Sequence, residues 1–182
     1  VDKYIPNDPD EYVIVITDHI SLLQPEKGDD LWNAIFKFSS EYCLSMRDRW
    51  KYAVVNIQQQ ASDQEKQQFT FKGDTIVAKL RPTPDGLADC KLTQRDCNIM
   101  FGLFAPHRYK IEEYDDIPVE ELGDNYRELS ILLNRSGSSG ALKVDMYFNG
   151  ASNYFSRIPF HSTNEDMKKT IQIIKSINGR TI

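Results

Sequence analysis

The stretch Tyr12–His19, with the sequence YVIVITDH, constrains the fold more than any other part of the chain. Its valines and isoleucines are typical of a strand, and a near-continuous apolar run is typical of a strand buried on both faces. Asp18 follows this strand directly. Ligands of open α/β sheets bind at the carboxyl ends of strands, so Asp18 is a candidate metal ligand. The alternative is an aspartate that caps the next turn.

A helix and a second apolar strand follow. Leu31–Met46 carries apolar residues at helical spacing on one face, namely Leu31, Ile35, Phe38, Tyr42 and Met46, and Asp29 or Asp30 can cap this helix. Tyr52–Ile57 is the second strand, and it runs into three glutamines that begin with Gln58. Two strands joined by a crossover helix form a right-handed unit with parallel strands. We therefore expect an α/β fold with a mainly parallel sheet.

The rest of the chain predicts more strands and one more helix. The Ser- and Gly-rich sequence RSGSSG separates two strand-like segments, which is typical of a hairpin. An amphipathic helix is expected at about 163–176, with Met167, Ile171 and Ile174 facing inward and Thr163 as its cap. The expected strands are Asn98–Phe104, Glu128–Leu133, Ala141–Phe148 and Tyr154–Ile158.

Composition limits the class of protein. A chain of 182 residues predicts a single domain, and its net charge of −5 excludes a general polycation, so that nucleic acid would need a local basic strip. The three cysteines include no CxxC pair, which favours free thiols in a reducing, cytoplasmic compartment. No apolar run reaches membrane-spanning length, so we expect no membrane partner.

Four patches in order resemble the carboxyl-terminal part of a RecA-like ATPase core, in particular the DnaB-type replicative helicases. They are YVIVITDHISLL, AVVNIQQQ, TQRDCNIMFGLFAPHRY and ELSILLNRSGSSG. The resemblance extends from about Tyr12 to Ile158. It implies a fragment of a three-layer RecA-like sandwich, in which an antiparallel hairpin closes a mainly parallel sheet and a carboxyl-terminal helix follows.

The resemblance also implies roles for three residues. Asp18 takes the place of the acid that holds the metal ion, and Gln58 takes the place of the glutamine that senses the terminal phosphate. Arg135 takes the place of a basic residue that reaches the ATP of a neighbouring subunit in a hexamer. The alternatives are a polar strand end for Gln58 and an ordinary surface arginine for Arg135.

The polar segment Gln59–Lys79 corresponds to a loop that binds single-stranded DNA in that family. Lys66, Lys72 and Lys79 are the candidate phosphate contacts, because lysines neutralise the charge of the DNA backbone. The alternative is a solvated loop, since acidic residues in the same segment dilute the positive charge.

One motif of the family is missing. A P-loop requires GxxxxGK followed by Ser or Thr, and none of the nine glycines precedes a lysine. The family carries this motif upstream of the first strand, and the start at Val1 favours a fragment. We therefore expect the carboxyl-terminal part of a hexameric helicase that uses ATP and Mg²⁺ only in the full protein. The alternative is a non-catalytic RecA-like scaffold or interaction module in replication or recombination.

Overall fold

The computed structural model describes residue 5 and residues 7–61, 70–71, 74–75, 80–138, 142–158 and 164–178. The chain forms two compact units, of which the first comprises Val1–Gln67 and Thr83–Asn98 and the second Gln68–Pro82 and Ile99–Ile182. Each unit has its own apolar core. The expectation that the whole chain is a single domain stays a prediction.

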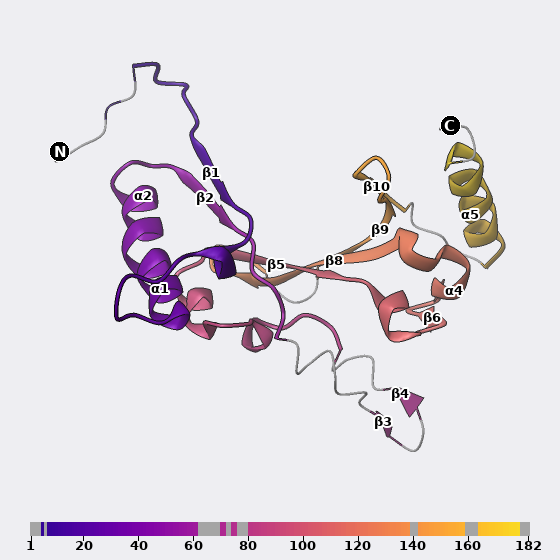
Figure 1. The fold of residues 1–182 in the computed structure, drawn as a ribbon. Helices are drawn as coiled ribbons and strands as arrows, with labels where there is room; N and C mark the ends of the chain where they lie inside the picture. Colours follow the sequence, from indigo (N-terminus) through magenta and orange to yellow (C-terminus); the bar gives the residue numbers. More distant parts are fainter. Residues whose placement is uncertain are drawn as a thin grey trace. The chain divides into compact units, whose positions relative to one another are not determined.

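The first unit contains the expected pair of parallel strands. β1 (Ile14–Thr17) and β2 (Ala53–Asn56) pair in parallel with their first residues opposite each other and their last residues opposite each other (Figure 1). A helical stretch connects them. The strand–helix–strand unit predicted from the sequence is thus confirmed in this part of the chain.

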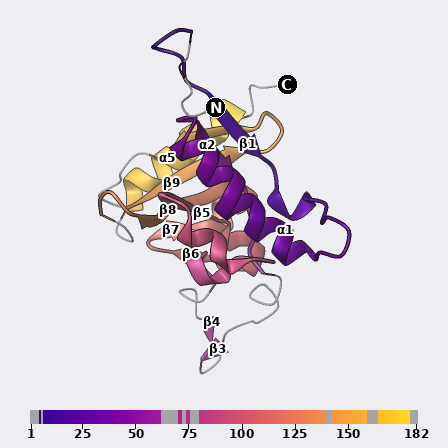
Figure 2. The same ribbon diagram turned by 90° about the vertical axis from the view of Figure 1, so that its left-hand side faces the viewer.

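The connecting stretch has three parts that follow one another without a break. They are α1 (Leu31–Lys37), a π-helical segment (Phe38–Cys43) and α2 (Leu44–Asp48), which Figure 2 shows as one continuous helical stretch. Asp30 begins it, because its side chain accepts a hydrogen bond of 2.8 Å from the backbone N–H of Asn33. This bond satisfies one of the free amides of the first helical turn.

The π-helical segment changes which residues face the core. Helical spacing predicted that Tyr42 faces inward, but its side chain is 58% exposed. Ile35, Ser39 and Cys43 are buried instead. A π-turn holds more residues than an α-turn, so steps of four replace the mixture of three and four, and Tyr42 rotates toward solvent.

Burial of the first strand on both faces was expected and is wrong for the described residues. Ile14 and Ile16 are 62% and 66% exposed. Successive side chains of a strand alternate between the two faces of a sheet. Ile14, Ile16 and the neighbouring Val55 of β2 share the face that the described residues leave open.

The second unit is built on a four-stranded antiparallel sheet with the order β10-β9-β8-β5. Every neighbouring pair in it is antiparallel (Figure 1). The β8–β9 pair is the predicted hairpin. The strands are β5 (Ile99–Phe104), β8 (Tyr126–Asn134), β9 (Lys143–Asn149) and β10 (Tyr154–Arg157).

The expected fold class, a RecA-like three-layer sandwich with a mainly parallel sheet, is therefore wrong. The larger sheet is antiparallel, and the parallel sheet has only two strands. The physical reason is the connection before β5. A parallel strand requires a crossover of a dozen or more residues, usually a helix. Among the described residues between β2 and β5, the helices are the short 3₁₀ turns Pro84–Gly86 and Lys91–Arg95, and the strands are the two-residue pieces Thr70–Phe71 and Asp74–Thr75.

A helix and short irregular elements complete the second core. α5 (Asn164–Asn178) is the predicted last helix, and Met167 and Ile171 pack into the core as its spacing predicts. Its predicted cap, Thr163, lies outside the described residues. Among the described helices, none is long and apolar enough to cross a membrane. The short elements of this unit are β3 (Thr70–Phe71), β4 (Asp74–Thr75), β6 (Glu113–Tyr114), β7 (Ile117–Pro118) and α4 (Val119–Leu122).

Gly102 in β5 lies where two side chains leave no room for a Cβ atom. A Cβ atom built there would lie 2.9 Å from Leu132 Cδ1 and 2.9 Å from Pro82 Cβ. We expect Gly102→Ala to lower the free energy of unfolding by about 1–3 kcal/mol, as overpacking does. Gly150→Ala is the control, because its nearest contact is an ordinary 3.4 Å to Phe148 Cε1. Equal urea midpoints for the two variants would contradict the crowding argument.

Candidate functional site

The parallel strands bring two predicted site residues to the same edge of one sheet. Thr17 and Asn56 end the two strands opposite each other, Asp18 follows the first strand, and Gln58 lies just past the second. This edge is where ligands of parallel sheets bind. The sequence therefore placed Asp18 and Gln58 on neighbouring strand ends correctly.

Asp18 presents an accessible carboxylate. Its side chain is exposed, and within the described part of the chain it forms no hydrogen bond or ion pair. No group of three or more His, Cys, Asp and Glu side chains that could hold a metal ion occurs among the described residues. Mg²⁺ typically takes one or two carboxylates together with waters and substrate phosphates, so a single aspartate fits that ion.

The next residue, His19, contributes a buried polar atom. Its Nδ1 is buried and has no hydrogen-bond partner within the described residues. Such atoms are uncommon in folded proteins, because burial without a partner costs free energy. It lies one residue from the candidate carboxylate and one before the buried Ile20.

Gln58 is held by protein contacts on both ends of its amide. Its Nε2 donates to the carbonyl oxygens of Ala88 and Cys90, at 2.5 and 3.0 Å, and its Oε1 accepts from the Thr93 hydroxyl at 2.7 Å. These bonds tie the end of β2 to the segment 88–93. Gln58 is thus already hydrogen-bonded to two backbone carbonyls and one hydroxyl. A phosphate that binds to its amide would have to replace one of these partners.

Arg135 lies where the hairpin turns. It is the first residue after β8, and its side chain is exposed. Asn134 shapes the turn, since its Oδ1 accepts from the backbone N–H of Ser136 at 3.1 Å and its Nδ2 donates to the carbonyl of Ser138 at 3.3 Å. Arg135 belongs to the second unit, whereas Asp18 and Gln58 belong to the first. Of the three candidate catalytic residues, only Asp18 and Gln58 therefore share a unit.

The candidate DNA contacts Lys66, Lys72 and Lys79 lie outside the described residues, and their role stays a prediction. Described residues on both sides of these lysines make contacts within the fold. On the amino-terminal side, the backbone N–H of Ala61 donates to the carbonyl of Gly86 at 2.9 Å. On the carboxyl-terminal side, Leu80 is buried in the core of the second unit.

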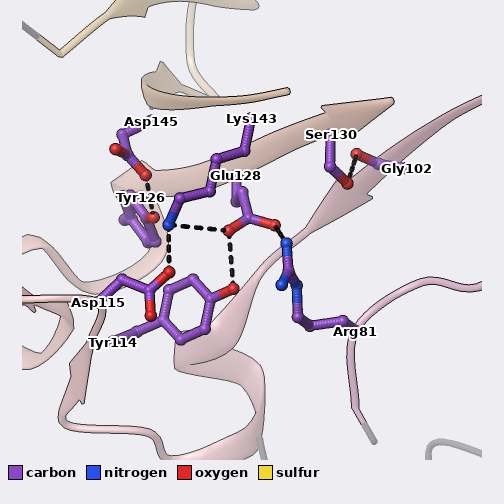
Figure 3. Close-up of polar contacts among 9 residues, drawn as sticks. All are labelled: Arg81, Gly102, Tyr114, Asp115, Tyr126, Glu128, Ser130, Lys143 and Asp145. Carbon is purple, nitrogen blue, oxygen red and sulfur yellow. Dashed lines mark hydrogen bonds and ion pairs between the residues drawn. The ribbon is translucent and has the colours of Figure 1, made fainter. Parts of the chain in front are cut away.

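A polar cluster in the second unit, not predicted from the sequence, centres on Glu128. This side chain in β8 is fully buried, with 0% of its surface exposed. Arg81 Nη2 donates to its Oε1 at 2.5 Å, and the Tyr114 hydroxyl donates to its Oε2 at 2.7 Å (Figure 3). Lys143 Nζ lies 3.8 Å from Oε2 and also pairs with Asp115. The buried carboxylate is thus surrounded by donors and cations.

Two tyrosines respond to this environment. Burial, followed by the hydrogen bond to Glu128, raises the pKa of Tyr114 far above its usual value. Burial, followed by the hydrogen bond to Asp145, likewise raises the pKa of Tyr126, whose hydroxyl lies 2.6 Å from Asp145 Oδ1. Both hydroxyls therefore stay protonated at neutral pH and act as hydrogen-bond donors.

The sequence contained one usable signal for this cluster. Residues two apart in a strand share a face. Tyr126, Glu128 and Ser130 are spaced in this way, and all three are buried. Their partners Arg81 and Tyr114 come from distant parts of the chain, which strand periodicity alone does not identify.

Comparisons with known proteins add no family to this description. No family model matches the chain, and a search of curated proteins finds no similar sequence.

Proposed function

We propose that this chain is the carboxyl-terminal part of a hexameric, ATP-dependent DNA helicase motor that translocates on single-stranded DNA. The observation that carries the proposal is the position of Asp18 and Gln58, which follow neighbouring parallel strands joined by a helical crossover. The ordered likeness of four sequence patches to DnaB-type helicases adds to it.

The proposal gives Asp18 the task of holding Mg²⁺. The exposed carboxylate has no competing partner among the described residues, and Mg²⁺ bound to ATP needs few protein ligands. When bound, the ion neutralises charge on the phosphates during phosphoryl transfer. The P-loop would have to come from residues outside this sequence, because no glycine here begins such a motif.

Single-stranded DNA is the proposed partner of the segment 59–79. Lys66, Lys72 and Lys79 would neutralise phosphates, and each phosphate contact would add slightly less than one unit to the salt dependence of binding. The hexamer is part of the same proposal, because Arg135 is assigned to the ATP of a neighbouring subunit.

The second candidate function is a non-catalytic scaffold or interaction module in DNA replication or recombination. The hydrogen bonds of Gln58 favour it, because both ends of the amide already bind protein groups. A glutamine used in this way stabilises the fold without requiring a nucleotide.

ATP hydrolysis separates the two candidates. We expect the 182-residue chain alone to hydrolyse no ATP above background, because phosphoryl transfer requires the P-loop. We expect a longer form of the polypeptide that carries a P-loop to hydrolyse ATP, and Asp18→Asn to reduce its activity to background. The measurement is steady-state phosphate release.

Asp10→Asn is the matched control, because Asp10 is another exposed aspartate near the same strand. Full activity of the Asp18→Asn variant would remove Asp18 from the metal site. A longer polypeptide that neither binds nor hydrolyses ATP would favour the scaffold.

A further inference from the structure

One of the two edge strands of the larger sheet, β5, lacks the usual protection against pairing. β5 is outermost in the sheet as described, so one of its edges carries backbone N–H and C=O groups without a neighbouring strand among the described residues. Natural edge strands are blocked by charged residues, prolines or bulges in the edge strand. The sequence of β5, IMFGLF, contains no charge and no proline.

The bulge of this strand pair does not protect the edge. Met100 pairs with Leu133 and Phe101 pairs with Ile131, so the extra residue, Leu132, belongs to β8. β5 itself therefore keeps the regular alternation of an extended strand. Its outer edge remains suited to a further strand.

One face of β5 is also apolar and exposed. Ile99, Phe101 and Leu103 are 48%, 59% and 51% exposed, and they alternate with residues on the opposite face of the sheet, where Phe104 packs into the core. An added strand would continue this face and cover part of the three side chains. The pattern thus offers both backbone hydrogen bonds and apolar area to one occupant.

We propose that the occupant is a second copy of β5, paired antiparallel across a two-fold axis at Phe101. The apolar pattern is symmetric about this residue, because Ile99 lies two positions before it and Leu103 two positions after it. In this register Phe101 lies opposite Phe101 of the second copy, and Ile99 lies opposite Leu103. A register shifted by one residue would put exposed side chains opposite core-facing ones. A shift of two residues would keep the faces matched but would pair Ile99 with Ala105, so the register centred on Phe101 covers the most apolar area.

A second copy suits this strand better than a charged or irregular partner. β5 has no charge that would repel the same residue in the second copy. Facing phenylalanines form a favourable cross-strand pair. A symmetric contact of this kind uses the same surface on both subunits and closes after two copies. This interface is independent of ATP and DNA, and so goes beyond the proposed function.

Self-association of the 182-residue chain is the first test. Sedimentation velocity over a range of concentrations is expected to show a monomer–dimer equilibrium, and Phe101→Lys is expected to weaken the dimer at least about tenfold, because like charges would face each other on the axis. Ile173→Lys is the control, since Ile173 on α5 is also 59% exposed. It is expected to leave the dimer unchanged. A chain that stays monomeric at every concentration overturns the proposal.

Cysteine cross-linking tests the register and keeps the proposal falsifiable if Phe101→Lys fails to fold. Cys97 is replaced by serine first, because it is partly exposed and could form disulfides of its own. Cys43 and Cys90 can stay, because both are buried. Phe101→Cys is then expected to form a disulfide-linked dimer under mild oxidation. Ile99→Cys is not, because the two copies of residue 99 would lie four residues apart, about 13 Å along the strands, and a disulfide needs Cα atoms within about 7 Å.

The double variant Ile99→Cys/Leu103→Cys is expected to cross-link again, because these two positions face each other across the axis. Equal cross-linking of the Ile99→Cys and Phe101→Cys single variants would overturn the two-fold register. Dimers that form without cross-linking at Phe101→Cys would place the interface elsewhere and overturn the proposal as well.

Discussion

Glu128→Ala is expected to lower the free energy of unfolding by about 3 kcal/mol, the lower end of the range found when one partner of a buried ion pair is removed. The carboxylate is fully buried and accepts hydrogen bonds from Arg81 and Tyr114. Without it, the Tyr114 hydroxyl loses its acceptor in a buried site, and the guanidinium of Arg81 loses its ion pair. The alanine also leaves unfilled volume beside Tyr114.

Urea unfolding followed by circular dichroism measures this loss. Glu120→Ala is the matched control, since Glu120 is exposed, and it should change the free energy of unfolding by less than about 0.5 kcal/mol. Tyr114→Phe removes one donor and keeps the charge pair, so its cost should be smaller, about 1–2 kcal/mol. If Glu128→Ala costs no more than Glu120→Ala, the cluster does not stabilise the second unit.

Arg135→Ala is expected to lower ATP hydrolysis at least about a hundredfold in a longer polypeptide that carries a P-loop, with nucleotide binding and folding nearly intact. The planar guanidinium suits charge that is spread over phosphate oxygens. Arg135 is exposed at the hairpin turn, where the bonds of Asn134 shape the backbone. A side chain in that position can reach another molecule.

Mixing the variants tests whether Arg135 acts on a neighbouring subunit. Hexamers made of Arg135→Ala and Asp18→Asn subunits should regain part of the activity, because some interfaces would join an intact aspartate to an intact arginine. Arg157→Ala, which removes another exposed arginine of the same sheet, should hydrolyse ATP normally. Normal hydrolysis by Arg135→Ala, or mixed hexamers without rescue, would exclude the role in trans.

Elements that depend on neighbouring residues were predictable from the sequence. The apolar alternation and the RSGSSG turn identified the β8–β9 hairpin, and the spacing of Met167 and Ile171 identified the inward face of α5. The first two strands and their helical connection also followed from local patterns. In each of these elements, the residues whose pattern predicts the helix or strand lie close together in the sequence.

Long-range pairing was not predictable in the same way. The pattern of β5 shows that it is a strand, but an apolar strand of six residues fits a parallel or an antiparallel neighbour equally well. Its antiparallel pairing with β8 depends on the connection between these two strands, which carries the short pair β6–β7 and α4 and gives little strand or helix signal of its own. The helix-like spacing of Tyr42 likewise failed, because the change to a π-helical segment leaves little trace in the apolar pattern.

The candidate site was predictable only where it followed strand ends. Asp18 and Gln58 could be placed because each follows an apolar strand. The partners of Gln58 could not, because Ala88, Cys90 and Thr93 lie in and before a short 3₁₀ helix about thirty residues further along the chain. Glu128 was assigned to a strand correctly, and its spacing with Tyr126 and Ser130 indicates its face, but its partners Arg81 and Tyr114 lie far away in the chain and could not be identified.

The side-chain amide of Gln58 holds the segment 88–93 in place, and a ligand at the end of β2 would have to use the same amide. A ligand that accepts a hydrogen bond from Gln58 Nε2, as a phosphate oxygen would, must displace the carbonyl of Ala88 or the carbonyl of Cys90, because these two acceptors already use both N–H groups. Binding at this strand end would therefore speed amide hydrogen exchange in residues 88–93, whereas ligands usually slow exchange near their sites. Faster exchange in residues 88–93 would therefore indicate that a ligand is bound at the end of β2, some thirty residues earlier in the chain.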